Sequence, residues 1–182
     1  RKYDVEVSSL VDYENMLDKA FEAALLRKLI GIKSALAYHR PLRYDNVSKP
    51  VAEKVFSDLM KSGTIYEFEQ VKPLQDYMMH CIIKLARKHD IPMQIHTGLQ
   101  AGDGNYIANA NPSHLANLFI EYRDVNFILM HGAYPYGGEL SALAKGFRNV
   151  FVEMSWVYII SPSYAARYLH EWIETVPANK IL

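Results

Sequence analysis

Two histidines follow short apolar runs at matching positions in the sequence. His96 comes directly after residues 91–95, His131 comes directly after residues 126–130, and each is followed within two residues by a glycine. Short apolar runs that end at a turn are typical of buried strands, and neighbouring strands of a sheet lie roughly 4.8 Å apart. Two imidazoles at equivalent strand ends could therefore reach one metal ion or one substrate. The alternative is that each histidine only caps its strand by binding a loop carbonyl, but the pairing favours a site.

Three other side chains could serve the same site. Lys33 lies inside the apolar run 32–38, where an unpaired lysine is unfavourable. It could anchor a substrate anion, act as a general base or become a carbamylated metal ligand, or it could reach solvent in a salt bridge. Arg40 could bind a substrate carboxylate through two hydrogen bonds, or lie in solvent. Tyr134 could line a pocket, or simply pack.

Two carboxylates and the remaining histidines have weaker claims. Asp103 lies in a loop and Glu153 lies near the exit of another apolar run. Each is more typical of a turn former or a hydrogen-bond partner than of a catalytic group. Four histidines fall on or beside predicted helices and are interpreted as surface or packing residues: His80, His89, His114 and His170.

The elements that must position these residues alternate along the chain. Period-two and apolar runs predict strands, and apolar residues at helical spacing predict helices. The predicted strands are 3–9, 32–38, 91–96, 126–131, 150–154 and the beginning of one at 181–182; the predicted helices are 13–29, 51–60, 73–89, 111–122, 137–147 and one from 161 onward.

This order indicates an α/β fold with a parallel sheet covered by helices. The sheet could be open and doubly wound, or an arc of a (β/α)8 TIM barrel. The sequence has no Gly-x-Gly-x-x-Gly, which weakens a nucleotide-binding fold. A complete barrel typically needs about 250 residues, and 182 are present. We therefore expect one domain over 1–182, an incomplete barrel and a piece of something longer, with a loop and helix insertion at about 40–70.

Composition restricts the partners. Twenty basic and twenty acidic residues balance, so no electrostatic surface for nucleic acid or an anionic membrane is expected. The sequence contains no apolar run long enough for a membrane span. The single Cys81 and the lack of a signal peptide predict a cytoplasmic protein. The expected partner is a small-molecule substrate, and a homo-oligomer is one option for the assembly.

Several motifs resemble a known family as a set. They are MQIHTG at 93–98, NPSHL at 111–115, ILMHGAYP at 128–135 and NVFVEMS at 149–155. Together they resemble the amidohydrolase-related branch of the metal-dependent amidohydrolase superfamily. GIKSALAYHR at 31–40 is similar to the fourth strand of the subgroup that is fused to glutamine synthetase in plants and fungi.

The resemblance implies a metal-bearing (β/α)8 barrel in which these residues have roles. It makes His96 a metal ligand, His131 a second ligand or a proton-transfer residue, and Lys33 the counterpart of a lysine that binuclear members carbamylate. The family's strand-one His-x-His pair and strand-eight aspartate are not in this sequence.

The function that follows is hydrolysis by a metal-activated water, with a divalent metal, zinc in the first instance. The substrate would be small, and acidic or of the amide or ester type, with His131 and Lys33 catalytic and Arg40 and Tyr134 binding substrate. The alternatives are a decarboxylase, a uronate-type isomerase, or a non-catalytic scaffold derived from the barrel.

Overall fold

The computed structural model describes residues 6–62 and 67–182. The chain forms two compact units, which are described separately. The first contains the residues up to Ile30 together with Tyr44–His89, and the second contains Gly31–Arg43 together with Asp90–Leu182. The expectation of a single domain stays a prediction. The helix α2 (Lys49–Ser62) lies within the segment that was predicted to be an insertion.

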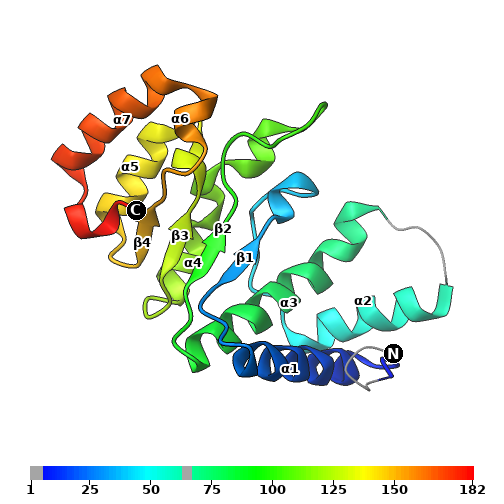
Figure 1. Cartoon of the computed structure of the whole chain (residues 1–182). Coiled ribbons are helices and arrows are strands. Elements are labelled where there is room, and N and C mark those ends of the chain that lie inside the picture. Colours follow the sequence, from blue (N-terminus) through cyan, green and yellow to red (C-terminus); the bar gives the residue numbers. More distant parts are fainter. Residues whose placement is uncertain (1–5, 63–66) are drawn as a thin grey trace. The chain divides into compact units, whose positions relative to one another are not determined.

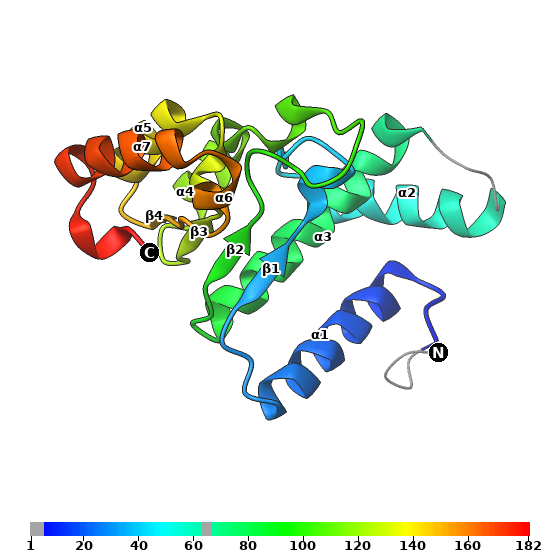
Figure 2. The same ribbon diagram turned by 45° about the horizontal axis from the view of Figure 1, so that its top comes forward.

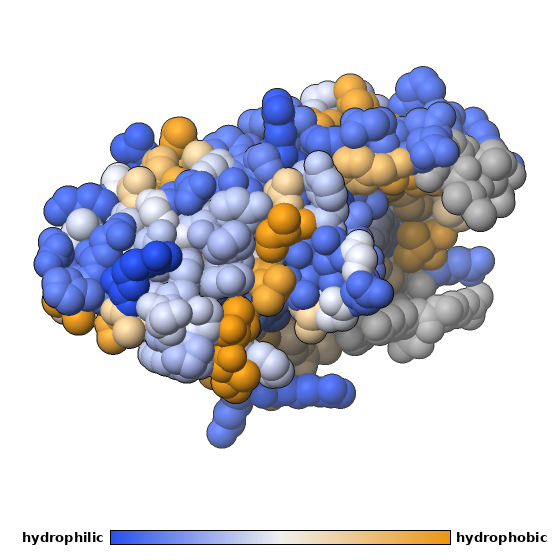
Figure 3. Space-filling model, turned by 90° about the horizontal axis from the view of Figure 1, so that it is seen from above, coloured by the Kyte–Doolittle hydropathy of each residue, from blue (hydrophilic) through white to orange (hydrophobic). Residues whose placement is uncertain are grey.

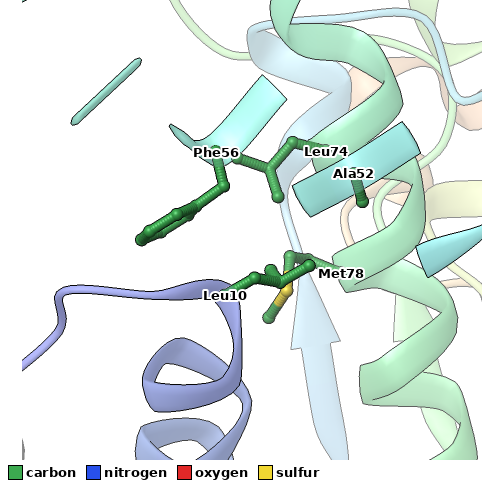
Figure 4. Packing of buried hydrophobic residues seen from close by; sticks show 5 residues of the cluster. All are labelled: Leu10, Ala52, Phe56, Leu74 and Met78. Atoms are coloured by element: carbon green, nitrogen blue, oxygen red, sulfur yellow. The ribbon is translucent and has the colours of Figure 1, made fainter. Parts of the chain in front are cut away.

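The first unit is helical. It contains α1 (Leu10–Leu26), α2 and α3 (Phe68–Lys88) (Figure 1). The three helices meet at a cluster of buried apolar side chains, which Figure 4 shows: Leu10, Ala52, Phe56, Leu74 and Met78. Leu74 and Met78 lie on the apolar face that helical spacing predicts for α3, whereas Leu10 precedes the helix predicted at 13–29.

The helix starts differ from those predicted because of local capping. Ser9 accepts a hydrogen bond from the N–H of Asp12, whose carboxylate accepts from the N–H groups of Ser8 and Ser9. This capping box makes residues 6–9 irregular, so the strand predicted at 3–9 is wrong there, and its remainder lies outside the described residues. A second box, of Glu67 and Gln70, starts α3 before Pro73, which was predicted to lie in the first turn.

The second unit contains a four-stranded parallel sheet. Its strands are β1 (Ile32–Ser34), β2 (Met93–Ile95), β3 (Phe127–Leu129) and β4 (Val150–Val152), which lie side by side in chain order (Figures 1 and 2). Ile181 pairs with Val152 as the next parallel bridge. The order never reverses, as it would at the switch point of a doubly wound sheet, so it favours the barrel. The α/β class and the parallel sheet are confirmed.

The strands are shorter than the apolar runs that predicted them. The 32–38 run ends as a strand at Ser34, whose carbonyl accepts from the N–H of His96, and then forms the 3-10 turn Leu36–Tyr38. The helix predicted at 111–122 is also divided, into a 3-10 turn, Pro112–Leu115, and α4 (Ala116–Glu121). Short turns at the carboxyl ends of the strands therefore replace the last residues of the predicted strands.

The two faces of the sheet have different surroundings. Met93, Phe127 and Val150 are buried on one face, and on that side of the unit α5 (Gly137–Gly146) packs on β4 and α7 (Pro162–Thr175) packs on α5. On the other face each strand has one residue that is not buried, which is exposed in β1 and partly covered in the other three strands. These residues are in register across the sheet: Lys33, Gln94, Ile128 and Phe151.

Asn149 joins α4 to the sheet. Its side-chain amide is buried and donates to the carbonyls of Phe119 (3.2 Å) and Tyr122 (2.9 Å), while its own carbonyl accepts from the N–H of Phe127. At neutral pH, Asn149→Asp would place an unpaired buried carboxylate against two carbonyls. We expect the free energy of unfolding in urea to fall by about 3 kcal/mol or more.

The matched control is Asn105→Asp, because Asn105 also donates to a carbonyl, that of Ala101, but does so at the surface. This variant is expected to stay within about 0.5 kcal/mol of the wild type. Equal effects of the two substitutions would contradict a structural role for the Asn149 amide.

No helix among the described residues is both long enough and apolar enough to cross a membrane. The face seen in Figure 3 is mainly hydrophilic, with a narrow strip of apolar residues near its middle and smaller apolar groups elsewhere.

Candidate functional site

A cavity of about 460 Å³ lies within the second unit, at the carboxyl ends of β1, β2, β3 and β4. This is the edge of a parallel α/β sheet at which active sites are found. Its lining combines imidazoles, one lysine, aromatic rings and aliphatic side chains: Lys33, Tyr38, His96, Leu99, Gln100, Ala101, Met130, His131, Ser155, Trp156 and Ile160.

The structure brings the two sequence-predicted histidines together. β2 and β3 are paired, and His96 and His131 follow them at the same edge of the sheet. Their ring centroids are 4.7 Å apart in an edge-to-face arrangement. The spacing expected for side chains at the ends of adjacent strands is therefore observed.

His96 is buried and held in one tautomer. Its Nε2 lies 3.1 Å from the carbonyl oxygen of Leu99. A carbonyl can only accept, so Nε2 carries the proton and Nδ1 has the free lone pair. Burial lowers the pKa of His96 to about 4, with further lowering by the neighbouring His131 and Lys33. The ring is therefore neutral at pH 7.

His131 begins a left-handed turn. The φ angles of His131, Gly132 and Ala133 are 65°, 56° and 48°. The left-handed region costs roughly 1–2 kcal/mol for each residue with a Cβ, so neighbouring groups must hold this turn in place. The hydroxyl of Tyr164 donates to the carbonyl of Gly132 (2.9 Å), and Thr97 donates to that of Met130 (2.8 Å).

The ring of His131 also has a fixed tautomer. Its Nδ1 lies 3.0 Å from the main-chain carbonyl oxygen of Ser155. By the same reasoning as for His96, Nδ1 carries a proton, so the neutral form of the ring has its free lone pair on Nε2. The nitrogen that is not bound to a carbonyl therefore differs between the two rings: it is Nδ1 in His96 and Nε2 in His131.

Lys33 reaches the cavity from β1. Its side chain lies on the partly covered face of the sheet and lines the cavity, and its Nζ donates to the weakly accepting Sδ of Met130. Burial lowers the pKa of Lys33, and the carboxylate of Glu153 opposes that shift. The lysine therefore reaches the same cavity as the two imidazoles.

Arg40 and Tyr134 do not line this cavity. Arg40 is only 2% exposed, and its guanidinium donates to the carbonyls of Pro41 and Arg43. The ring of Tyr134 packs edge-to-face on Tyr164, with centroids 4.8 Å apart. The substrate roles predicted for Arg40 and Tyr134 therefore depend on the sequence argument alone.

Gln100 and Trp156 are two of the cavity residues that were not singled out from the sequence. Gln100 donates to the carbonyls of Ala37 (3.0 Å) and Tyr106 (3.4 Å), and Trp156 lines the cavity from a left-handed position with φ 66°. Gln100 begins a loop without hydrophobic periodicity. Trp156 precedes a short helix, α6 (Val157–Ile160), that the sequence analysis did not predict. A tryptophan after a strand was the available signal.

The histidine pair fits part of a divalent-metal site. Each ring has one unprotonated nitrogen, and a main-chain carbonyl binds the other, as is usual for histidine ligands of metals. In the part of the chain that the structure describes, no three His, Cys, Asp or Glu side chains come together. Catalytic zinc usually has three protein ligands, so these residues fit as two nitrogen ligands.

Comparison with known proteins gives the family. Residues 60–182 match the sequence model of the amidohydrolase family. The chain therefore belongs to the amidohydrolases, as the motifs indicated.

Two relatives that the chain matches are longer proteins. The chain is 29% identical over 164 residues to the protein fluG of Emericella nidulans, an alignment that covers 85% of this chain and 19% of fluG. A Lactobacillus casei protein assigned as a metal-dependent hydrolase is 26% identical, with a TM-score of 0.78 and coverage of 95% of this chain and 45% of that one. The chain thus spans about a fifth of one relative and less than half of the other.

Two sugar-acid isomerases share the fold. Uronate isomerase from Thermotoga maritima is 17% identical with a TM-score of 0.76, and glucuronate isomerase from Caulobacter crescentus is 19% identical with a TM-score of 0.71. The matches cover 96% and 97% of this chain but only 41% and 40% of theirs. At these identities the likeness concerns the fold alone, and it confirms an incomplete (β/α)8 barrel.

Proposed function

We propose that this chain contributes to the active site of a metal-dependent hydrolase acting on a small acidic amide or ester. The observation that carries the proposal is the pair His96 and His131, whose rings lie 4.7 Å apart with one unprotonated nitrogen each. Family membership and the likeness to a protein assigned as a metal-dependent hydrolase support it. The decarboxylase and isomerase alternatives share the barrel but are not favoured by any residue of this site.

Each residue has a role in this proposal. A bound divalent metal, zinc in the first instance, would supply a Lewis acid that polarises the scissile carbonyl and lowers the pKa of a water molecule. His96 would bind the metal through Nδ1. His131 would use Nε2 as a second ligand or to carry a proton to the leaving group. Lys33 would bind the substrate's carboxylate at the cavity wall.

The experiment uses the intact protein and a panel of small amides and esters, each as a carboxylate and as its neutral isostere, with uronates included. Elemental analysis is expected to find a divalent metal, and hydrolysis is expected for the anionic members. Turnover of uronates alone would favour the isomerase, and a metal-free protein that hydrolyses nothing would favour the scaffold.

Lys33→Met tests the anchoring role. It removes a charged hydrogen-bond donor, which is worth about 1.5–3 kcal/mol, so KM for anionic substrates should rise about 10-fold or more. Neutral isosteres should be unaffected. The control is Lys145→Met, because Lys145 is an exposed lysine in the last turn of α5. An equal KM rise for charged and neutral substrates would exclude Lys33 as the anchor.

A further inference from the structure

Glu153 is a half-buried carboxylate that follows β4 and lies beside the turn at His131. Its Oε2 accepts a hydrogen bond from the main-chain N–H of His131 (3.2 Å). Its own main-chain carbonyl accepts from the N–H of Gly132 (2.8 Å). Two consecutive N–H groups of the left-handed turn are therefore bound by this one residue.

The same carboxylate holds Ser155. Oε1 accepts from the N–H of Ser155 (2.6 Å), and Oε2 accepts from its hydroxyl (2.8 Å). The carbonyl of Ser155 is the group that binds Nδ1 of His131. Glu153 thus fixes the main chain of the histidine and also the residue that selects its tautomer.

Other contacts support different parts of this turn. The hydroxyl of Ser155 lies 3.3 Å from Nδ1 of His131, but it donates to Glu153 and so can only accept from the ring. Tyr164 holds the opposite side of the turn through the carbonyl of Gly132. Neither contact fixes the main-chain N–H of His131, which only Glu153 does among the bonds described here.

We propose that Glu153 is a positioning residue of the site. It fixes the orientation of the His131 ring and holds the neutral ring in the tautomer that carries its proton on Nδ1. It acts through the main chain of His131 and through Ser155, and it does not itself contact substrate. The inference rests on the proposed function for its catalytic consequence, although the tautomer it predicts for His131 is independent of any activity.

The test is Glu153→Gln in the intact protein. Glutamine keeps the shape but has one accepting oxygen where the carboxylate has two. It must therefore lose either the bond from the N–H of Ser155 or the bonds from the N–H of His131 and the hydroxyl of Ser155. Nitrogen NMR of ¹⁵N-histidine protein, with the His131 signals assigned from a His131→Gln variant, reports which ring nitrogen is protonated. Wild type is expected to show Nδ1–H alone, and Glu153→Gln a mixture of tautomers. With a substrate found in the panel, kcat should fall about 10–100-fold with KM little changed.

The matched control is Glu139→Gln, because Glu139 is an exposed carboxylate in the first turn of α5. It should leave both the tautomer and kcat unchanged. A folded Glu153→Gln protein with His131 still only Nδ1-protonated would overturn the proposal. If Glu153→Gln does not fold, the same measurement on Glu153→Asp decides, because the shorter carboxylate cannot reach both partners. An inactive wild type with the expected tautomers would contradict the proposed function and leave the positioning role supported.

Discussion

His96→Ala in the intact protein is expected to lower kcat/KM by more than about 100-fold and to reduce the bound metal strongly. Removing a residue that only binds a metal ligand typically lowers metal affinity or activity about 10–100-fold. Removing His96, which would be a ligand itself, should cost more. The substitution removes a buried imidazole that is neutral at pH 7, with its Nδ1 free. Elemental analysis and steady-state kinetics measure the two effects.

The control for this variant is His170→Ala. The side chain of His170 is 78% exposed and lies on α7, where it pairs only with Glu174 of the same helix among the contacts described. Its replacement should change neither the metal content nor the kinetics. Full activity of His96→Ala with unaltered metal content would end the metal-ligand proposal.

Gly98→Ala is expected to lower the free energy of unfolding by more than about 3 kcal/mol. The new methyl group would meet main-chain atoms, which cannot move aside as a flexible side chain could. A Cβ at this position would lie 2.6 Å from the main-chain nitrogen of Tyr134, and still closer to its carbonyl oxygen. The added atom would push against the turn that presents His131. Denaturation in urea measures the loss.

Gly104→Ala separates this steric effect from the cost of backbone conformation. Gly104 has φ 75°, against 74° for Gly98, but a Cβ at Gly104 would have nothing within 4 Å. Only the strain of a positive φ should then remain, which costs about 1–2 kcal/mol. Similar losses in the two variants would mean that the close approach of Gly98 to Tyr134 does not limit the site.

The sheet and its histidines were predictable because strand signals are local. Apolar runs fixed the strands, and parallel pairing then required His96 and His131 to meet at one edge. The left-handed turn was not predictable, because His131 and Ala133 have side chains that disfavour positive φ. Their conformation depends on Glu153 and on Tyr164, which come later in the chain.

Side-chain direction at a strand exit was also beyond the sequence. Lys33 lies in the run that contains β1 and Arg40 follows that run by two residues, yet Lys33 lines the cavity and Arg40 binds loop carbonyls. The sequence does not distinguish a basic residue that lines a cavity from one that binds loop carbonyls. The difference between Lys33 and Arg40 arises because the chain leaves the strand after Ser34. The position of Gln100 in the cavity was missed for a related reason. Its side chain binds the carbonyls of Ala37 and Tyr106, and these reach it only when the loops are folded.

Both imidazoles are anchored by main-chain oxygens, those of Leu99 and Ser155, and both of these residues also line the cavity. A carbonyl oxygen survives any change of its own side chain. Position 99 can therefore exchange leucine for larger, smaller or polar residues while the histidine beneath keeps its proton and its orientation. The lining of the cavity at position 99 can thus change without any change to the contacts that hold the two histidines.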